Sequence, residues 1–155
     1  MHILVVGGGM GGTILANNLA RRLSGELEQG SSKITMLSAT DKHMYQPGLL
    51  YVAVGKMSTT ELYRDQKSLL EPSIDFHVDP VEKFDMDNNS VTTKSGKKIS
   101  YDILCIATGS RGNAAGIPGL AENACQFYTE ADALAMYKKL QKFEGGKVVV
   151  ATGVP

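Results

Sequence analysis

Short apolar runs alternate with polar and glycine-rich stretches along the chain. The run Ile3–Val6 is rich in β-branched residues and stops at Gly7, which predicts a strand buried on both faces of a parallel sheet. Apolar side chains then recur at the spacing of one helix face, at Ile14, Leu15, Leu19 and Leu23. Because Lys33–Ser38 predicts a second strand, the chain is expected to open with a βαβ unit.

The middle of the chain is predicted to hold one helix and a small sheet. Residues 40–55 are expected to be irregular but are rich in apolar side chains, so this segment is expected to pack over another part of the protein or a ligand. Ser58 followed by Glu61 is typical of a capping box, which predicts a helix from there to about Leu70. Strands are then expected at Ile74–Val78, Val81–Met86 and Val91–Lys94, with a turn at Asn88 and Asn89.

The last third is expected to contain a strand at Tyr101–Ala107, a loop at 111–119, a helix at Glu130–Phe143 and a strand at Lys147–Ala151. The final run repeats the pattern of the N-terminal strand, which indicates the start of a second dinucleotide-binding unit. We therefore predict an α/β fold with a central parallel sheet and a small antiparallel β-meander. The expected domains are 1–110, a connecting segment with a helix at 111–146, and the truncated second unit at 147–155.

Composition narrows the class of protein. The 155 residues carry 16 basic and 16 acidic side chains, and this zero net charge argues against nucleic acid as a partner. The two cysteines are far apart, which disfavours a disulfide-stapled domain or zinc ribbon and indicates a reducing, cytoplasmic compartment. No apolar run approaches the ~20 residues of a membrane helix, which leaves only peripheral membrane contact open. The histidines, His2, His43 and His77, lack ligand spacing, so no metal site is expected.

The clearest chemical signal is the segment 7–12, GGGMGG, which satisfies G-x-G-x-x-G between a predicted strand and a predicted helix. In this motif Gly7 permits a tight turn, Gly9 lets the backbone approach a pyrophosphate, and Gly12 allows close helix–strand packing. The N-terminus of the helix would offer free N–H groups to the phosphates. The alternative is a glycine-rich turn without a ligand.

The usual partner of this motif is an acidic residue that ends the second strand and bonds the ribose hydroxyls. Ser38 holds that place here, and its hydroxyl can bond a ribose less strongly than a carboxylate would. Asp41 could substitute, although a solvated loop aspartate is the simpler interpretation. We therefore expect Ser38 to be the ribose contact.

Three segments together resemble the flavoproteins with two dinucleotide-binding domains: residues 7–12, residues 43–55 (HMYQPGLLYVAVG) and residues 101–109 (YDILCIATG). Within these the chain most resembles the sulfide:quinone oxidoreductases and flavocytochrome c sulfide dehydrogenases, as part of a longer protein. The resemblance implies that the first domain is a Rossmann-like FAD-binding domain. It also implies an enzyme that passes electrons from a small-molecule donor, sulfide or NAD(P)H, through FAD to a quinone, and that assembles as a homo-oligomer.

The resemblance assigns FAD contacts position by position. Residues Gly7, Gly9, Met10, Gly11 and Gly12 would hold the pyrophosphate, and Ser38 the adenosine ribose. The backbone of Val81 would meet the adenine edge, and Thr108, Gly109 and Arg111 would close the other side. Tyr45 and Pro47 would lie beside the flavin ring. The alternatives are loop packing for Tyr45 and Pro47 and a solvated loop arginine for Arg111.

The sulfide chemistry of this family uses cysteines next to the flavin. Cys105 lies inside an apolar strand and is expected to be an inert core residue. Cys125 precedes the element TEADA at 129–133 but stands three residues out of the family's register, so its redox role is a weaker hypothesis. Two other functions stay open: a type II NADH:quinone dehydrogenase and a dinucleotide-binding module without redox chemistry.

Overall fold

The computed structural model describes residues 1–113 and 116–151. It divides the chain into two compact units. The first unit contains Met1–Tyr45 and Thr60–Gly112. The second contains Gln46–Thr59 and the described residues between 113 and 151.

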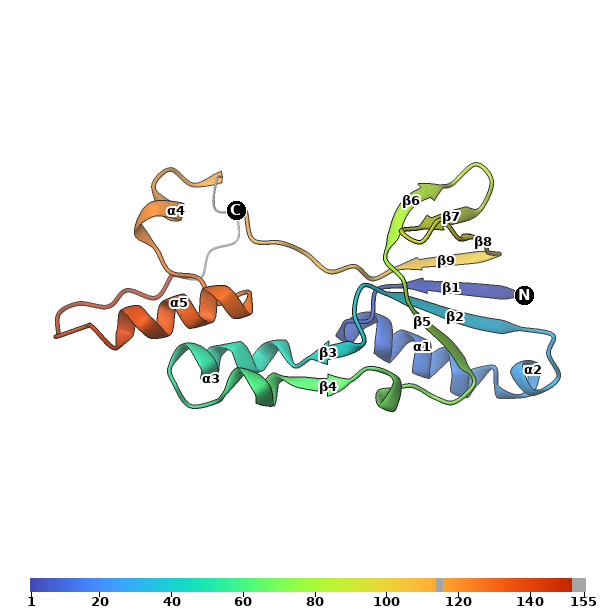
Figure 1. Cartoon of the computed structure of the whole chain (residues 1–155), viewed down its shortest axis with the longest axis horizontal. Helices are drawn as coiled ribbons and strands as arrows, with labels where there is room; N and C mark the ends of the chain where they lie inside the picture. Colours follow the sequence, from blue (N-terminus) through green and yellow to red (C-terminus); the bar gives the residue numbers. More distant parts are fainter. Residues whose placement is uncertain (114–115, 152–155) are drawn as a thin grey trace. The chain divides into compact units, whose positions relative to one another are not determined.

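A four-stranded parallel sheet is the centre of the first unit (Figure 1). Its strands are β1 (His2–Val6), β2 (Lys33–Ser38), β5 (Ile74–Val78) and β9 (Ile103–Ile106), in the order β5-β2-β1-β9. The helix α1 (Met10–Arg22) and the short helix α2 (Ser24–Glu28) connect β1 to β2. The predicted βαβ unit and parallel sheet are therefore confirmed.

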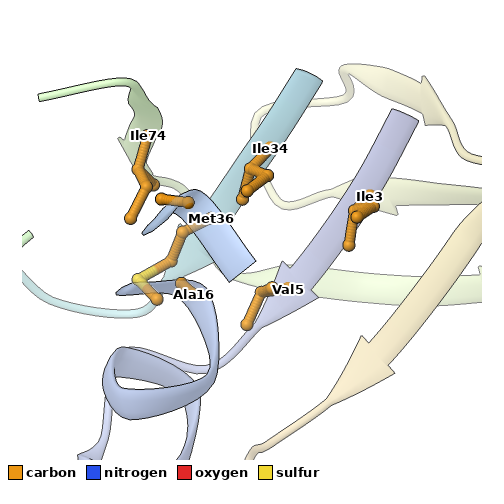
Figure 2. Close-up of a cluster of buried hydrophobic side chains, with 7 residues drawn as sticks. Ile3, Val5, Ala16, Ile34, Met36 and Ile74 are labelled. Carbon is orange, nitrogen blue, oxygen red and sulfur yellow. The ribbon is translucent and has the colours of Figure 1, made fainter. Parts of the chain in front are cut away.

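The face of the sheet toward α1 holds one of two core clusters. Figure 2 shows Ile3 and Val5 from β1, Ile34 and Met36 from β2, and Ile74 from β5 around Ala16 of the helix. The expectation that Ile14 belongs to the buried helix face is wrong, because its side chain is 55% exposed. The buried face of α1 carries small residues instead, Gly12, Thr13, Ala16 and Ala20. Small side chains allow the helix to lie close to the strands.

The opposite face of the sheet is covered by an antiparallel meander (Figure 1). The meander consists of β6 (Val81–Asp85), β7 (Ser90–Thr93) and β8 (Lys98–Ser100). Leu4, Val6 and Leu37 of the sheet pack in one cluster with Val91, Ile99 and Tyr101. The turn before β7 places Asn89 at φ 45°, a conformation that asparagine tolerates. β6 and β7 confirm the two predicted strands of the meander, whereas no strand was predicted at the position of β8.

The predicted helix from Ser58 to Leu70 is wrong. The chain instead forms a 3₁₀ turn, η2 (Thr59–Leu62), the strand β4 (Tyr63–Asp65) and a second turn, η3 (Lys67–Leu69). β4 pairs antiparallel with β3 (Lys42–Met44), which lies in the segment expected to be irregular. The backbone groups of β4 bond to this distant strand, and the pairing overrides the local capping signal.

The described residues of the second unit include three α-helices. The turn η1 (Gln46–Gly48) leads into α3 (Leu49–Ala53), while α4 (Leu120–Asn123) precedes α5 (Glu130–Leu140). α3 packs against α5, and the ring of Tyr137 lies directly over Gly55. The helix predicted from Glu130 is confirmed, although it ends at Leu140. The strand expected at 147–151 is absent from the described residues, where Val148, Val149 and Val150 are 60%, 75% and 82% exposed. No neighbouring strand pairs with this run in the part of the chain that the structure describes, and a strand needs such a partner.

Candidate cofactor-binding site

The glycine segment 7–12 connects the end of β1 to the start of α1, and two of its glycines are required by the fold. Gly7 has φ +116°, and a side chain there would overlap the carbonyl of Ala107 at the end of β9. A side chain at Gly12 would overlap the carbonyl of Gly7. These two positions therefore join strand, loop and helix at distances that only glycine allows.

Gly9 and Gly11 differ from those two, because no protein atom lies within 4 Å of where their side chains would begin. Both residues are exposed, and so is Met10 at the start of α1. Gly9 is the N-cap of the helix, and no side chain caps it. The N–H groups of the first turn have no partner within the helix, and together with the helix dipole they favour an anion. The open side of this loop can accept a pyrophosphate.

Ser38, at the end of β2, lies against the glycine loop. Its side chain is 6% exposed, and a methyl group at Gly8 would come 2.6 Å from its hydroxyl oxygen. The backbone N–H of Thr40 donates to the same oxygen at 3.4 Å. Sequence reasoning did not single out Gly8, whose lack of a side chain makes room for Ser38. Asp41 is exposed and follows this turn.

The end of β9 lies beside the glycine loop as well. The N–H of Ala107 donates to the carbonyl of Val6 at 2.7 Å, which continues the pairing of β9 with β1. A side chain at Gly7 would reach within 3.1 Å of the backbone nitrogen of Thr108. Gly109 has φ +79°, a conformation that favours glycine. The structure thus brings Thr108 next to the loop and places Arg111, which is exposed, three residues further along.

Val81 begins β6 and pairs with Thr93 of β7. The preceding turn is anchored by Asp79, whose carboxylate accepts hydrogen bonds from the Ser95 hydroxyl at 2.6 Å and the Ser95 N–H at 3.2 Å. Hydrogen bonds from the side chains of Ser95 and Thr93 hold the pKa of Asp79 below its ordinary value. A pocket of about 280 Å³ adjoins this turn and is lined by Leu37, His77, Val78, Asp79, Ser95, Lys97 and Ile99.

The two predicted flavin-ring residues fall in different units. Tyr45 ends a segment of the first unit, with its ring half-exposed and its N–H donating to the carbonyl of Leu62 at 2.7 Å. Pro47 lies in η1 of the second unit and is exposed.

The two cysteines have different surroundings. Cys105 is partly buried and packs against the core cluster on the α1 face of the sheet. Cys125 is exposed and lies between α4 and α5 in the second unit. Within residues 1–113 and 116–151, no three His, Cys, Asp or Glu side chains are grouped as metal ligands would be. Over the same residues, no helix has the length and apolar character to cross a bilayer.

The strand, open glycine loop and helix at the carboxyl edge of a parallel sheet define a dinucleotide-binding domain of the Rossmann type. The chain belongs to the pyridine nucleotide-disulphide oxidoreductase family, a family of FAD-dependent oxidoreductases, whose model matches residues 1–154. This membership confirms the resemblance stated from the sequence.

Individual relatives agree with the family match. The chain is 38% identical over 152 residues to sulfide-quinone reductase from Aquifex aeolicus. The aligned region covers 96% of this chain and 34% of that protein. It is 29% identical over 153 residues to mitochondrial sulfide:quinone oxidoreductase from Mus musculus, with 96% and 33% covered. The crystal structure of the Aquifex aeolicus sulfide:quinone oxidoreductase superposes with a TM-score of 0.74 at 34% identity, covering 91% of this chain and 32% of that one. The chain thus spans about a third of these relatives.

Proposed function

We propose that this chain is the FAD-binding part of a sulfide:quinone oxidoreductase. The observation that carries the proposal is the glycine loop, in which Gly7 and Gly12 are enclosed by the protein while Gly9 and Gly11 face open space. A loop built only for folding would need glycine at the enclosed positions alone. Glycine at the open positions leaves room for a ligand to approach the backbone. The family match and the sulfide:quinone relatives support FAD as that ligand.

The residues around the loop suit the parts of FAD in turn. The first-turn N–H groups of α1, from Met10 onward, would hold the pyrophosphate, and Ser38 would bond the ribose. Val81 would meet the adenine through its backbone, and Thr108, Gly109 and Arg111 would approach from the β9 side. Tyr45 and Pro47 would lie at the ring. FAD, when bound, supplies two-electron transfer chemistry, which here would connect sulfide to a quinone.

The test is made on the complete protein, purified without added cofactor. We expect flavin absorbance, loss of that absorbance when sulfide is added without oxygen, and its recovery when a soluble quinone follows. The matched control is Gly9→Val, which is expected to fold and lack flavin. Bleaching by NADH and not by sulfide would instead indicate a type II NADH:quinone dehydrogenase. A folded protein that retains no flavin would leave the non-catalytic dinucleotide-binding module as the better assignment.

A further inference from the structure

A buried amide side chain, Gln66, lies against the glycine loop. It follows β4, its side chain is 0% exposed, and a methyl group at Gly8 would come 3.5 Å from its Cδ. A buried amide costs free energy unless its donors and acceptor are hydrogen-bonded. The partners of Gln66 therefore indicate what the residue does.

Those partners come from three separate elements. The Nε2 group donates to the hydroxyl of Thr13 in α1 at 2.9 Å and to the sulfur of Met36 in β2 at 3.9 Å. The Oε1 atom lies 3.0 Å from Nδ1 of His43 in β3. The backbone N–H of Gln66 donates to the carbonyl of Asp41 at 2.8 Å. One side chain thus ties the β3–β4 ribbon to the sheet and to the helix that begins at the loop.

Two of these side-chain partners, Thr13 and His43, also reach the carbonyl of Gly8. The Thr13 hydroxyl donates to this oxygen at 3.3 Å, and Nδ1 of His43 lies 3.2 Å from it. The two nearest oxygens to Nδ1, those of Gln66 and Gly8, accept hydrogen bonds only. The Thr13 hydroxyl lies 3.5 Å from Nδ1 and donates to the Gly8 carbonyl, so Nδ1 acts as a hydrogen-bond donor toward the Gln66 and Gly8 oxygens.

Turning the Gln66 amide over gives a poorer arrangement. Its NH₂ group would then face Nδ1 of His43, which would have to accept, and its oxygen would take the proton of the Thr13 hydroxyl. The Gly8 carbonyl would lose both of its side-chain donors. The arrangement in which Nδ1 donates gives the Gly8 carbonyl two side-chain donors and leaves both ends of the Gln66 amide hydrogen-bonded.

We propose that Gln66 is a positioning residue of the glycine loop, which acts through Thr13 and His43 to hold the Gly8 carbonyl. Fixing this peptide before the ligand arrives orients the loop toward a pyrophosphate and lowers the conformational entropy lost on binding. The inference rests on the proposed function, because FAD is the ligand in question. The position of the loop itself can be measured without FAD, so the two proposals can fail separately.

The test compares variants of the complete protein. Gln66→Met and Thr13→Val keep approximately the same shape and remove the hydrogen bonds, while Thr13→Ser keeps the hydroxyl. His43→Asn retains a donor near the position of Nδ1, whereas His43→Gln places its amide further out. Val91→Ala is the matched control, since it removes buried methyl groups in the meander, away from these side chains.

Two readouts are taken. The first is the rate of amide hydrogen exchange, measured in the cofactor-free protein on a peptide that includes Gly7 and Thr13. The N–H of Gly7 bonds to the carbonyl of Leu37, and the N–H of Thr13 bonds to the carbonyl of Gly9. The second is the dissociation constant of FAD. We expect Gln66→Met, Thr13→Val and His43→Gln to speed exchange in this peptide and to raise the dissociation constant about fivefold to tenfold. Thr13→Ser and His43→Asn should remain within about twofold of the wild type.

The control separates positioning from general stability. Val91→Ala should lower the unfolding midpoint yet leave exchange of the loop peptide and FAD binding unchanged. The proposal is overturned if Val91→Ala loosens the loop as much as Gln66→Met does. The proposal is also overturned if the Thr13→Val and His43→Gln proteins fold and keep the wild-type exchange rate in the loop peptide. If Gln66→Met does not fold, these two variants alone test the proposal. A wild type that binds no FAD would refute the proposed function, while the exchange pattern would still decide the role of Gln66.

Discussion

The carbonyl oxygen of Gly7 occupies the space in which a side chain at Gly12 would begin. This relationship makes the last glycine of the motif a folding requirement, because the loop and the helix would have to separate to admit even a methyl group. Gly9, three residues before it, has no such neighbour. The same motif therefore contains glycines of two kinds, and substitutions should tell them apart.

Gly12→Ala should lower the free energy of unfolding by about 3 kcal/mol, the upper range for overpacking. Gly9→Val should lower it by no more than about 1 kcal/mol, the cost of a poor N-cap, yet abolish flavin retention. Urea unfolding and the flavin absorbance of the purified proteins measure the two effects. A yellow, stoichiometric Gly9→Val protein would refute the assignment of the open face of the loop.

Cys105→Ala should cost roughly 1 kcal/mol of stability, because the side chain packs against the core cluster as a small hydrophobe. Sulfide-dependent flavin reduction should remain nearly unchanged. Cys125→Ala is the matched comparison, since its exposed side chain should change stability by less than about 0.5 kcal/mol. Loss of flavin reduction in a folded Cys105→Ala protein would contradict the core assignment. Loss in Cys125→Ala would support the redox hypothesis for that residue.

Lowering the pH should destabilise the first unit through His2. Burial, with a smaller contribution from Lys33, lowers the pKa of His2 below its ordinary value of 6.5, while Nε2 lies 2.8 Å from the Thr35 hydroxyl. The unfolded chain then binds more protons than the folded one below about pH 6.5. The contribution of neutral His2 to the free energy of unfolding is therefore fully present above that pH. It declines as the pH falls toward the pKa of His2 in the folded state.

His2→Gln keeps a polar group near Nε2 and cannot titrate, so it should show a smaller loss of stability on acidification. Urea midpoints of both proteins at about pH 7.5 and about pH 5.5 provide the comparison. Equal losses in the wild type and the variant would show that other groups cause the pH dependence.

Thr129→Ala should lower stability by about 1 kcal/mol, measured as unfolding of the second unit. Thr129 caps α5 by accepting from the Asp132 N–H at 3.2 Å, and the Asp132 carboxylate accepts from the Thr129 N–H at 3.1 Å. Thr129→Ser keeps this reciprocal pair and should retain most of the stability. If both variants unfold alike, the hydroxyl does not contribute.

The sequence by itself determined the elements whose signals are local. The run Ile3–Val6, the glycine segment 7–12 and the strand Lys33–Ser38 predicted the βαβ unit correctly, because periodicity and glycine spacing act within a few residues. Strands β6 and β7 of the meander were predicted for the same reason, whereas β8 was not predicted. The family followed from the same motifs, although the contacts with FAD remain predictions.

Only the tertiary structure decided what depends on residues far apart in the chain. The capping signal at Ser58 predicted a helix, but β4 pairs with β3, some twenty residues earlier. The backbone groups that a helix would bond internally bond instead to the neighbouring strand. The hydrogen bond between Gln66 and Thr13 joins residues 53 positions apart, and no local sequence pattern around either residue predicts it. The value of a buried hydrogen bond depends on which groups the fold brings together and removes from water, and a sequence read locally does not contain that information.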